Sequence, residues 1–157
     1  MELTLLRHGI PVDPTLWDGP ESMRPLTAEG RTQAQAVIGS LAKSGNLSIE
    51  EIWSSPYVRC VETARIAAEI LGIPMRLSPA LASGADLIRS LPHLQGDAAG
   101  WPGHLLCVGH APDLGLLISA LTRTSNGHYS LGRCGVARLT GKFALNEMKL
   151  EWIKNVI

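Results

Sequence analysis

Short apolar runs alternate with longer segments of helical periodicity along this chain, and this alternation constrains the fold more than any other feature of the sequence. The apolar runs predict buried strands at residues 3–6, 49–54 and 104–108, and a segment of helical periodicity follows each of them. Strands that alternate with helices form a mostly parallel sheet with helices packed on its faces. We therefore predict an α/β fold, a three-layer α/β/α sandwich in a single domain over residues 1–157.

The predicted helices have recognisable ends. Thr27 is the expected N-cap of the first helix, which Gly45 and Asn46 would stop. Ser55 as N-cap and Pro56 at the first position would open the second helix, and Pro112 precedes the third. The stop of the second helix is expected at two residues, Gly72 and Pro74. Core-facing residues recur at helical spacing: Ala34, Val37, Ile38 and Leu41, then Val58, Val61, Ala64, Ala68 and Leu71, then Leu114, Leu117, Ile118 and Leu121.

Two late strands are expected at residues 136–140 and 148–153. The link between them is too short for a crossover helix, so they should form an antiparallel hairpin at one edge of the sheet. Residues 11–25 and 79–103 are expected to be loop insertions, the second with a helix near residues 86–91.

Composition excludes several classes of function. The 14 basic side chains balance 14 acidic ones, which argues against a nucleic-acid or anionic-membrane partner. The three cysteines have no metal-ligand or disulfide-framework spacing, so we expect no metal, no cofactor and a reducing, cytoplasmic location. The longest charge-free stretch, residues 98–112, is shorter than the ~20 residues that span a bilayer.

Candidate chemistry gathers where three predicted strands end. The first strand ends in Arg7, His8 and Gly9, the second leads to Arg59, and the later one ends at His110. The carboxyl ends of parallel strands share one edge of a sheet, where ligands of open α/β sheets bind. We therefore expect these side chains to meet there.

These residue types suit phosphoryl transfer. Arginine donates two parallel hydrogen bonds to phosphate oxygens, and neutral histidine has a lone pair for nucleophilic attack. A backbone carbonyl near Gly9 would accept the Nδ1 proton of His8 and leave its Nε2 free for phosphorus. A glycine at position 9 would also let the chain pass close to a substrate.

The order of the motifs resembles one family. The motifs are Leu5-Leu6-Arg7-His8-Gly9, Pro25-Leu26-Thr27 with Gly30, Ser54-Ser55-Pro56 with Arg59 and Glu62-Thr63-Ala64, and Val108-Gly109-His110. Together they resemble the histidine phosphatase superfamily, which is phosphoglycerate mutase-like, and most closely its short phosphohistidine phosphatases. The resemblance implies that His8 is the phosphorylated nucleophile and that Arg7, Arg59 and His110 surround the phosphate. It also implies Arg24 as a further pocket member and a metal-free α/β/α fold.

A carboxylate that protonates the leaving group in larger members of the superfamily has no evident counterpart. Residues 80–85 contain no acid, and Ala111 follows the second histidine. Asp86 and Asp113 remain as candidates, although a capping or dipole role in the third helix explains Asp113 more simply.

Other side chains receive structural interpretations. Cys60 should turn away from Arg59 and pack, and His93, His104 and His128 should be surface or edge residues. Trp17 would either contact a substrate protein or anchor its own loop.

Three functions remain open. The leading one is a metal-independent phosphatase that acts on phosphohistidine in a signalling or phosphotransfer protein. The others are a small-metabolite phosphomonoesterase and a non-catalytic module that binds phosphorylated ligands; the oligomeric state stays open.

Overall fold

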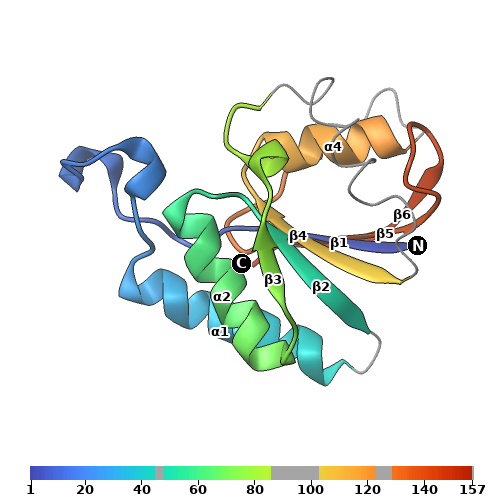
Figure 1. Ribbon diagram of the computed structural model, residues 1–157, viewed down its shortest axis with the longest axis horizontal. Coiled ribbons are helices and arrows are strands. Elements are labelled where there is room, and N and C mark those ends of the chain that lie inside the picture. The colour runs from blue at the N-terminus through green and yellow to red at the C-terminus, as the bar shows by residue number, and fades with distance from the viewer. Residues whose placement is uncertain (45–47, 86–102, 123–128, 157) are drawn as a thin grey trace.

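A computed structural model describes residues 1–44, 48–85, 103–122 and 129–156, and it has a six-stranded mixed sheet with helices on both faces (Figure 1). The strands are β1 (Glu2–Arg7), β2 (Ile49–Ser54), β3 (Met75–Leu77), β4 (His104–Gly109), β5 (Val136–Gly141) and β6 (Met148–Lys154). The helices are α1 (Ala28–Lys43), α2 (Val58–Leu71) and α4 (Asp113–Leu121), with 3-10 turns η1 (Pro14–Leu16), η2 (Glu21–Met23) and η3 (Pro79–Leu81). This is the predicted three-layer α/β/α sandwich.

The strand order across the sheet is β3-β2-β4-β1-β5-β6. Strand β4 is parallel to both β1 and β2, and β3 is parallel to β2. Strands β5 and β6 form the predicted antiparallel hairpin at one edge. Strand β3 was not predicted from the sequence, because three residues with one partner strand carry too little pattern.

Helix ends agree with the predictions in two places and differ in a third. Thr27 caps α1 by accepting a hydrogen bond from Gly30 N, and Gly72 ends α2 in the left-handed conformation. The prediction that Ser55 caps α2 was wrong, since the N-cap is Tyr57 and the Ser55 hydroxyl is used elsewhere. The expected stop of α1 at positions 45 and 46 lies outside the described residues.

The buried stripe of α2 also differs from the predicted one. Its buried residues are Arg59, Cys60, Thr63, Ala64 and Ala67, whereas Val58, Val61, Ala68 and Leu71 are only partly buried. On this stripe Cys60, Ala64 and Ala67 pack in the apolar core, whereas Arg59 and Thr63 contact backbone groups of Glu21 and Gly9. The predicted stripe of α4 is confirmed, since all four of its residues are buried.

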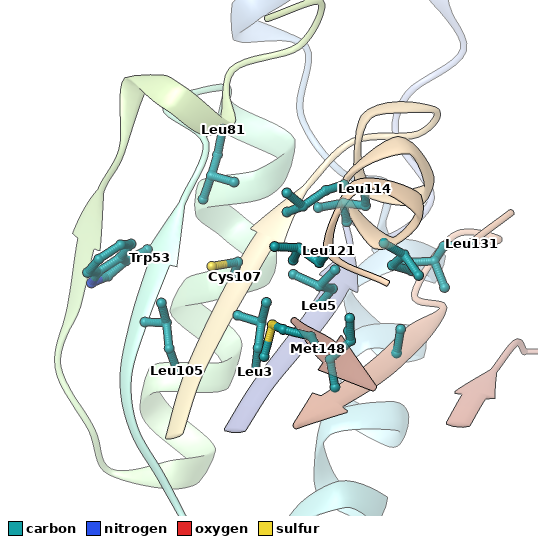
Figure 2. Close-up of a cluster of buried hydrophobic side chains, with 14 residues drawn as sticks. Leu3, Leu5, Trp53, Leu81, Leu105, Cys107, Leu114, Leu121, Leu131 and Met148 are labelled. Atoms are coloured by element: carbon teal, nitrogen blue, oxygen red, sulfur yellow. The ribbon is translucent and has the colours of Figure 1, made fainter. Parts of the chain in front are cut away.

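Each face of the sheet has its own apolar core. Residues of β1, β4 and β5 pack against α4 on one face, as Figure 2 shows for Leu3, Leu5 and Leu114. On the other face, α1 and α2 cover a second cluster that includes Ile38 and Ile52. Truncating one such buried side chain to alanine typically costs about 2–5 kcal/mol. The central strands β1 and β4 are therefore a rigid support for whatever their ends carry.

None of the helices in the described parts of the chain is both long and apolar enough to cross a membrane. The helix expected near residues 86–91 falls outside the described ranges.

Candidate functional site

The carboxyl ends of β1, β2 and β4 bring two histidines to one edge of the sheet. His8 N donates to Gly109 O (3.1 Å), and Ser55 N donates to Val108 O (3.0 Å), so the chain segments leaving the three strands stay in register. The rings of His8 and His110 consequently lie edge to face, with centroids 5.4 Å apart. The predicted meeting of these strand ends is confirmed.

His8 is held in one tautomer. Its Nδ1 lies 2.7 Å from Gly9 O, and a carbonyl oxygen can only accept, so Nδ1 carries the proton and Nε2 has the lone pair. Burial lowers the pKa of His8 to about 3, and the neighbouring His110, Arg59 and Arg7 act in the same direction. The imidazole is therefore neutral at physiological pH. This geometry is the one that the sequence analysis expected.

Gly9 and Gly30 let the chain that leaves β1 pack closely against the start of helix α1. A Cβ at this position would lie 2.9 Å from Gly30 O, and one at Gly30 would lie 2.2 Å from Ile10 O. The amide of Gly9 donates to Thr63 Oγ1 of α2 (3.1 Å). The two glycines and Thr63 thus fix the backbone that orients His8.

His110 is held by a serine that the sequence analysis assigned to a helix cap. Its Nε2 lies 2.8 Å from Ser55 Oγ, which also accepts a hydrogen bond from Tyr57 N (3.2 Å). The Tyr57 ring packs edge to face against His110 at 5.0 Å. Burial lowers the pKa of His110 to about 4, with Arg59 and Arg7 as further causes.

Cys60 does not turn away from the site as expected. It is fully buried, as a packing residue should be, but its Sγ lies 3.5 Å from His110 Nε2. Burial raises the pKa of this thiol to about 12, which keeps it protonated. Consecutive helix residues point ~100° apart, which led us to expect that Cys60 would face away from the site. The first turn of α2 packs so closely against the end of β4 that Cys60 still contacts His110.

Arg7 and Arg59 bring two guanidinium groups to the histidines. Arg7 Nη1 donates to Leu131 O (3.0 Å), and Arg59 Nη1 donates to Glu21 O (3.1 Å). Within the described residues, the Nε atom of each arginine is buried without a hydrogen-bond partner. Burial lowers the pKa of both groups, but both remain cations. Buried donors that lack an acceptor favour an anionic ligand between them.

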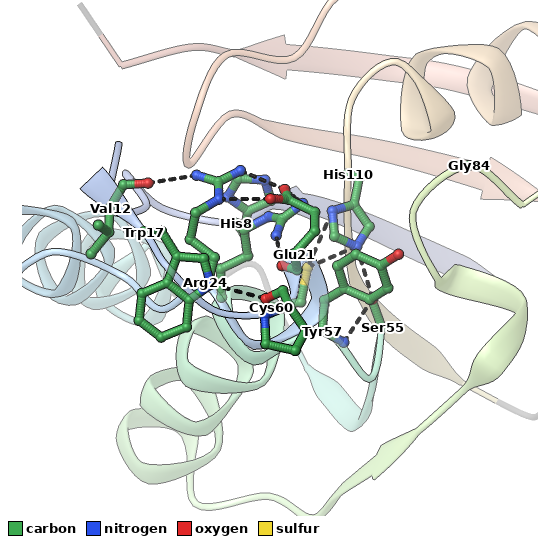
Figure 3. A network of polar contacts seen from close by, with 12 residues as sticks. His8, Val12, Trp17, Glu21, Arg24, Ser55, Tyr57, Cys60, Gly84 and His110 are labelled. Carbon is green, nitrogen blue, oxygen red and sulfur yellow. Dashed lines mark hydrogen bonds and ion pairs between the residues drawn. The ribbon is translucent and has the colours of Figure 1, made fainter. Parts of the chain in front are cut away.

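The loop after β1 supplies a third arginine. Arg24 is 8% exposed and donates through Nη1 to Val12 O (2.6 Å), while its Nε and Nη2 bind the Glu21 carboxylate (Figure 3). Glu21 also lies 3.3 Å from Arg59 Nη2. Arg24 thus adjoins the site as expected, whereas Glu21 was missed because a lone acid in a Pro-rich loop gives no periodic or motif signal.

The two remaining acid candidates lie differently. Asp113 is the first residue of α4, and its Oδ2 accepts a hydrogen bond from Gly84 N (3.1 Å). Burial raises the pKa of Asp113. Asp86 lies outside the described residues.

His104 and Trp17 both lie among the described residues, with different outcomes. His104 is buried at the opposite end of β4, so the surface or edge location expected for it was wrong. Trp17 donates from Nε1 to Pro20 O (2.9 Å), which fits the loop-anchor interpretation. His93 and His128 lie outside the described residues.

Two histidines and two arginines come together here, and the unpartnered Nε donors of the arginines could hold a tetrahedral anion. Among the described residues, no group of three or more His, Cys, Asp or Glu side chains is placed to hold a metal ion. The fold and the site together define an α/β protein with a cluster of histidines and arginines at the ends of its parallel strands.

The family follows from comparison with known proteins. The model of the histidine phosphatase superfamily (branch 1) matches residues 3–83. A protein of Picosynechococcus sp., itself uncharacterized, is 36% identical over 141 residues, which are 88% of this chain and 84% of the relative. The chain belongs to the histidine phosphatase superfamily, whose phosphatases act on phosphorylated proteins or small molecules.

Relatives whose names state an activity fall into two groups. The phosphohistidine phosphatase SixA of Escherichia coli (strain K12) is 27% identical over 123 residues, covering 77% of this chain and 74% of SixA. The solved structure of the protein histidine phosphatase SixA with tungstate has a TM-score of 0.86 at 22% identity, covering 99% of this chain and 97% of that one. A mycobacterial glucosyl-3-phosphoglycerate phosphatase has a TM-score of 0.73 at 21% identity, covering 96% of each chain. These structural likenesses establish the fold.

Proposed function

We propose that this phosphatase hydrolyses phosphohistidine in a phosphorylated protein, with His8 as the nucleophile. The observation that carries the proposal is the 2.7 Å contact of His8 Nδ1 with Gly9 O, because it fixes the lone pair on Nε2. That atom would attack phosphorus and form a phosphoimidazole, which water then hydrolyses.

Arg7, Arg59 and His110 would stabilise the phosphoryl group during both steps. The transferring group spreads its charge over three equatorial oxygens, and fixed donors aimed at those oxygens lower the barrier. The unpartnered Nε atoms of Arg7 and Arg59 supply such donors. Arg24 would support the pocket through its bonds to Glu21 and Val12 O.

The charge state of Glu21 favours substrates in which the bond to be broken is a phosphorus–nitrogen bond. The Glu21 carboxylate lies at the site, but its hydrogen bonds from Arg24 hold its pKa below the usual range, so at neutral pH it has no proton to donate. An alkoxide needs such a proton, and general acid catalysis typically contributes ~10²–10⁴-fold. A phosphohistidine ring that carries a proton on its other nitrogen departs as neutral imidazole, whose conjugate acid has a pKa near ~6.5, and so needs no acid from the enzyme.

A small-metabolite phosphomonoesterase is the second candidate, favoured by the likeness to the glucosyl-3-phosphoglycerate phosphatase. A module that only binds phosphorylated ligands is less well supported, because binding does not need a histidine whose Nε2 is held ready for attack.

Leaving-group dependence tests the choice. We expect turnover of a phosphohistidine protein and of aryl phosphates to exceed that of alkyl phosphates, with log kcat/KM falling steeply against leaving-group pKa. A flat plot would contradict the proposal and favour the metabolite enzyme. Asp113→Asn serves as the control: if that substitution abolishes alkyl phosphate hydrolysis, Asp113 is a general acid and the phosphohistidine preference loses its basis.

A further inference from the structure

The η2 turn places a carboxylate on the arginines of the candidate phosphate pocket. Glu21 Oε1 lies 2.7 Å from Arg24 Nη2, and Oε2 accepts from Arg24 Nε at 3.1 Å (Figure 3). Oε1 also lies 3.3 Å from Arg59 Nη2. A carboxylate between guanidinium groups makes the same charge-assisted hydrogen bonds that a phosphoryl oxygen would make. Glu21 and a substrate phosphoryl group would therefore compete for the guanidinium group of Arg59.

The Glu21 side chain can rotate away from the arginines, whereas the Glu21 backbone is held in place. The Glu21 carbonyl accepts from Arg59 Nη1 (3.1 Å) and from Arg24 N (3.3 Å), so η2 is held without the side chain. The Glu21 side chain is 56% exposed, whereas those of Arg24 and Arg59 are 10% and 6% exposed. A rotation toward solvent would release Arg59 and leave both arginines in place.

We propose that Glu21 is a specificity-determining residue: its carboxylate yields Arg59 to the incoming phosphoryl group and stays at the rim of the pocket, paired with Arg24. This inference rests on the proposed function, because it requires Arg59 to bind the phosphoryl group. A fixed negative charge at the rim repels a substrate that carries a second anionic group near phosphorus. The accepted substrates are phosphorylated side chains with neutral or cationic surroundings, and phosphorylated acids are rejected.

Binding of inorganic phosphate, measured by calorimetry, tests whether Glu21 competes with phosphate for Arg59. Glu21→Gln removes the charge but keeps the size and the backbone contacts, and we expect it to bind phosphate about fivefold more tightly, the size of one partly exposed ion pair. Structural damage would have the opposite sign. Glu69→Gln, on the exposed face of α2, is the matched control and should bind phosphate as the wild type does. Unchanged or weaker binding by Glu21→Gln would overturn the proposal.

A pair of substrates tests the selectivity. The ratio of kcat/KM for a phosphorylated hydroxy acid, such as phosphoglycerate, to that for p-nitrophenyl phosphate should rise about fivefold in Glu21→Gln. A ratio equal to that of the wild type would contradict the assignment of specificity to Glu21. Phosphate binding needs no turnover, so absence of phosphohistidine hydrolysis would refute the proposed function without changing the outcome of the binding comparison.

Discussion

Strand β4 carries a buried histidine near each of its ends, and the two surroundings differ. At its start, His104 Nε2 lies 2.6 Å from Thr4 Oγ1, and its Nδ1 lies 3.2 Å from the Glu2 carboxylate, which Arg138 also binds. Beyond its end, His110 faces Arg7 and Arg59, which act with burial to lower its pKa.

The difference lies in charge compensation, since both histidines have a pKa lowered to about 4, mainly by burial. The His104 end brings its own carboxylate and arginine, so its charges are balanced within the protein. At the other end, Arg7 and Arg59 both lie beside His110, and the carboxylate that pairs with Arg59, that of Glu21, is 56% exposed. A buried histidine with a lowered pKa is therefore not a functional signal by itself. The signal is the excess of buried arginines over buried carboxylates around His110.

The largest expected effect separates the two ends by activity. Replacing His8 with alanine removes the proposed nucleophile, so turnover should fall on the order of 10⁴-fold or more. His104→Ala should retain kcat and instead lower the free energy of unfolding. Steady-state kinetics and urea unfolding measure both. Substantial turnover by a folded His8→Ala protein would end the covalent mechanism.

The arginines give the next largest contrast. Arg59→Ala should lower kcat on the order of 10²-fold, as loss of one transition-state donor does, while phosphate binding weakens less. Arg138→Ala, at the balanced end, should leave kcat unchanged. If Arg59→Ala changed only KM, Arg59 would bind substrate and transition state equally and its proposed role would be wrong.

Acid should weaken the fold through the buried histidines. The folded-state pKa of His104 is about 4 against about 6.5 when unfolded, so the unfolded chain binds more protons and the free energy of unfolding falls as pH drops from about 6.5 toward 4. His104 should contribute a loss of about 1–2 kcal/mol between pH 7 and pH 5. Urea titrations of wild type and His104→Gln measure this, and equal pH slopes would contradict it.

Two matched hydroxyl deletions give the smallest effects. Ser55→Ala removes the partner of His110 and should lower kcat about tenfold, the equivalent of one hydrogen bond. Thr4→Val removes the partner of His104 at nearly unchanged volume and should cost about 1–3 kcal/mol of unfolding free energy without changing kcat. A kcat loss in Thr4→Val as large as that in Ser55→Ala would mean that the two ends do not differ in role.

Local patterns in the sequence predicted five of the six strands, helices α1, α2 and α4, and the gathering of the candidate site residues. Apolar periodicity predicted the central strands and the face of α4, and the strand exits predicted that His8, Arg7, Arg59 and His110 would gather. The carbonyl partner of His8 followed because it is the next residue in the chain.

The tertiary structure alone decided the contacts between residues far apart in the chain. Ser55 looked like a helix cap until β4 placed His110 beside it, and Cys60 looked like a packing residue until the same strand end reached it. Glu21 and His104 carried no pattern, because ion pairs with Arg59 or Glu2 depend on how the loop folds back and how strands align. Periodicity records which face of an element is buried, whereas charge compensation depends on which distant segments meet there.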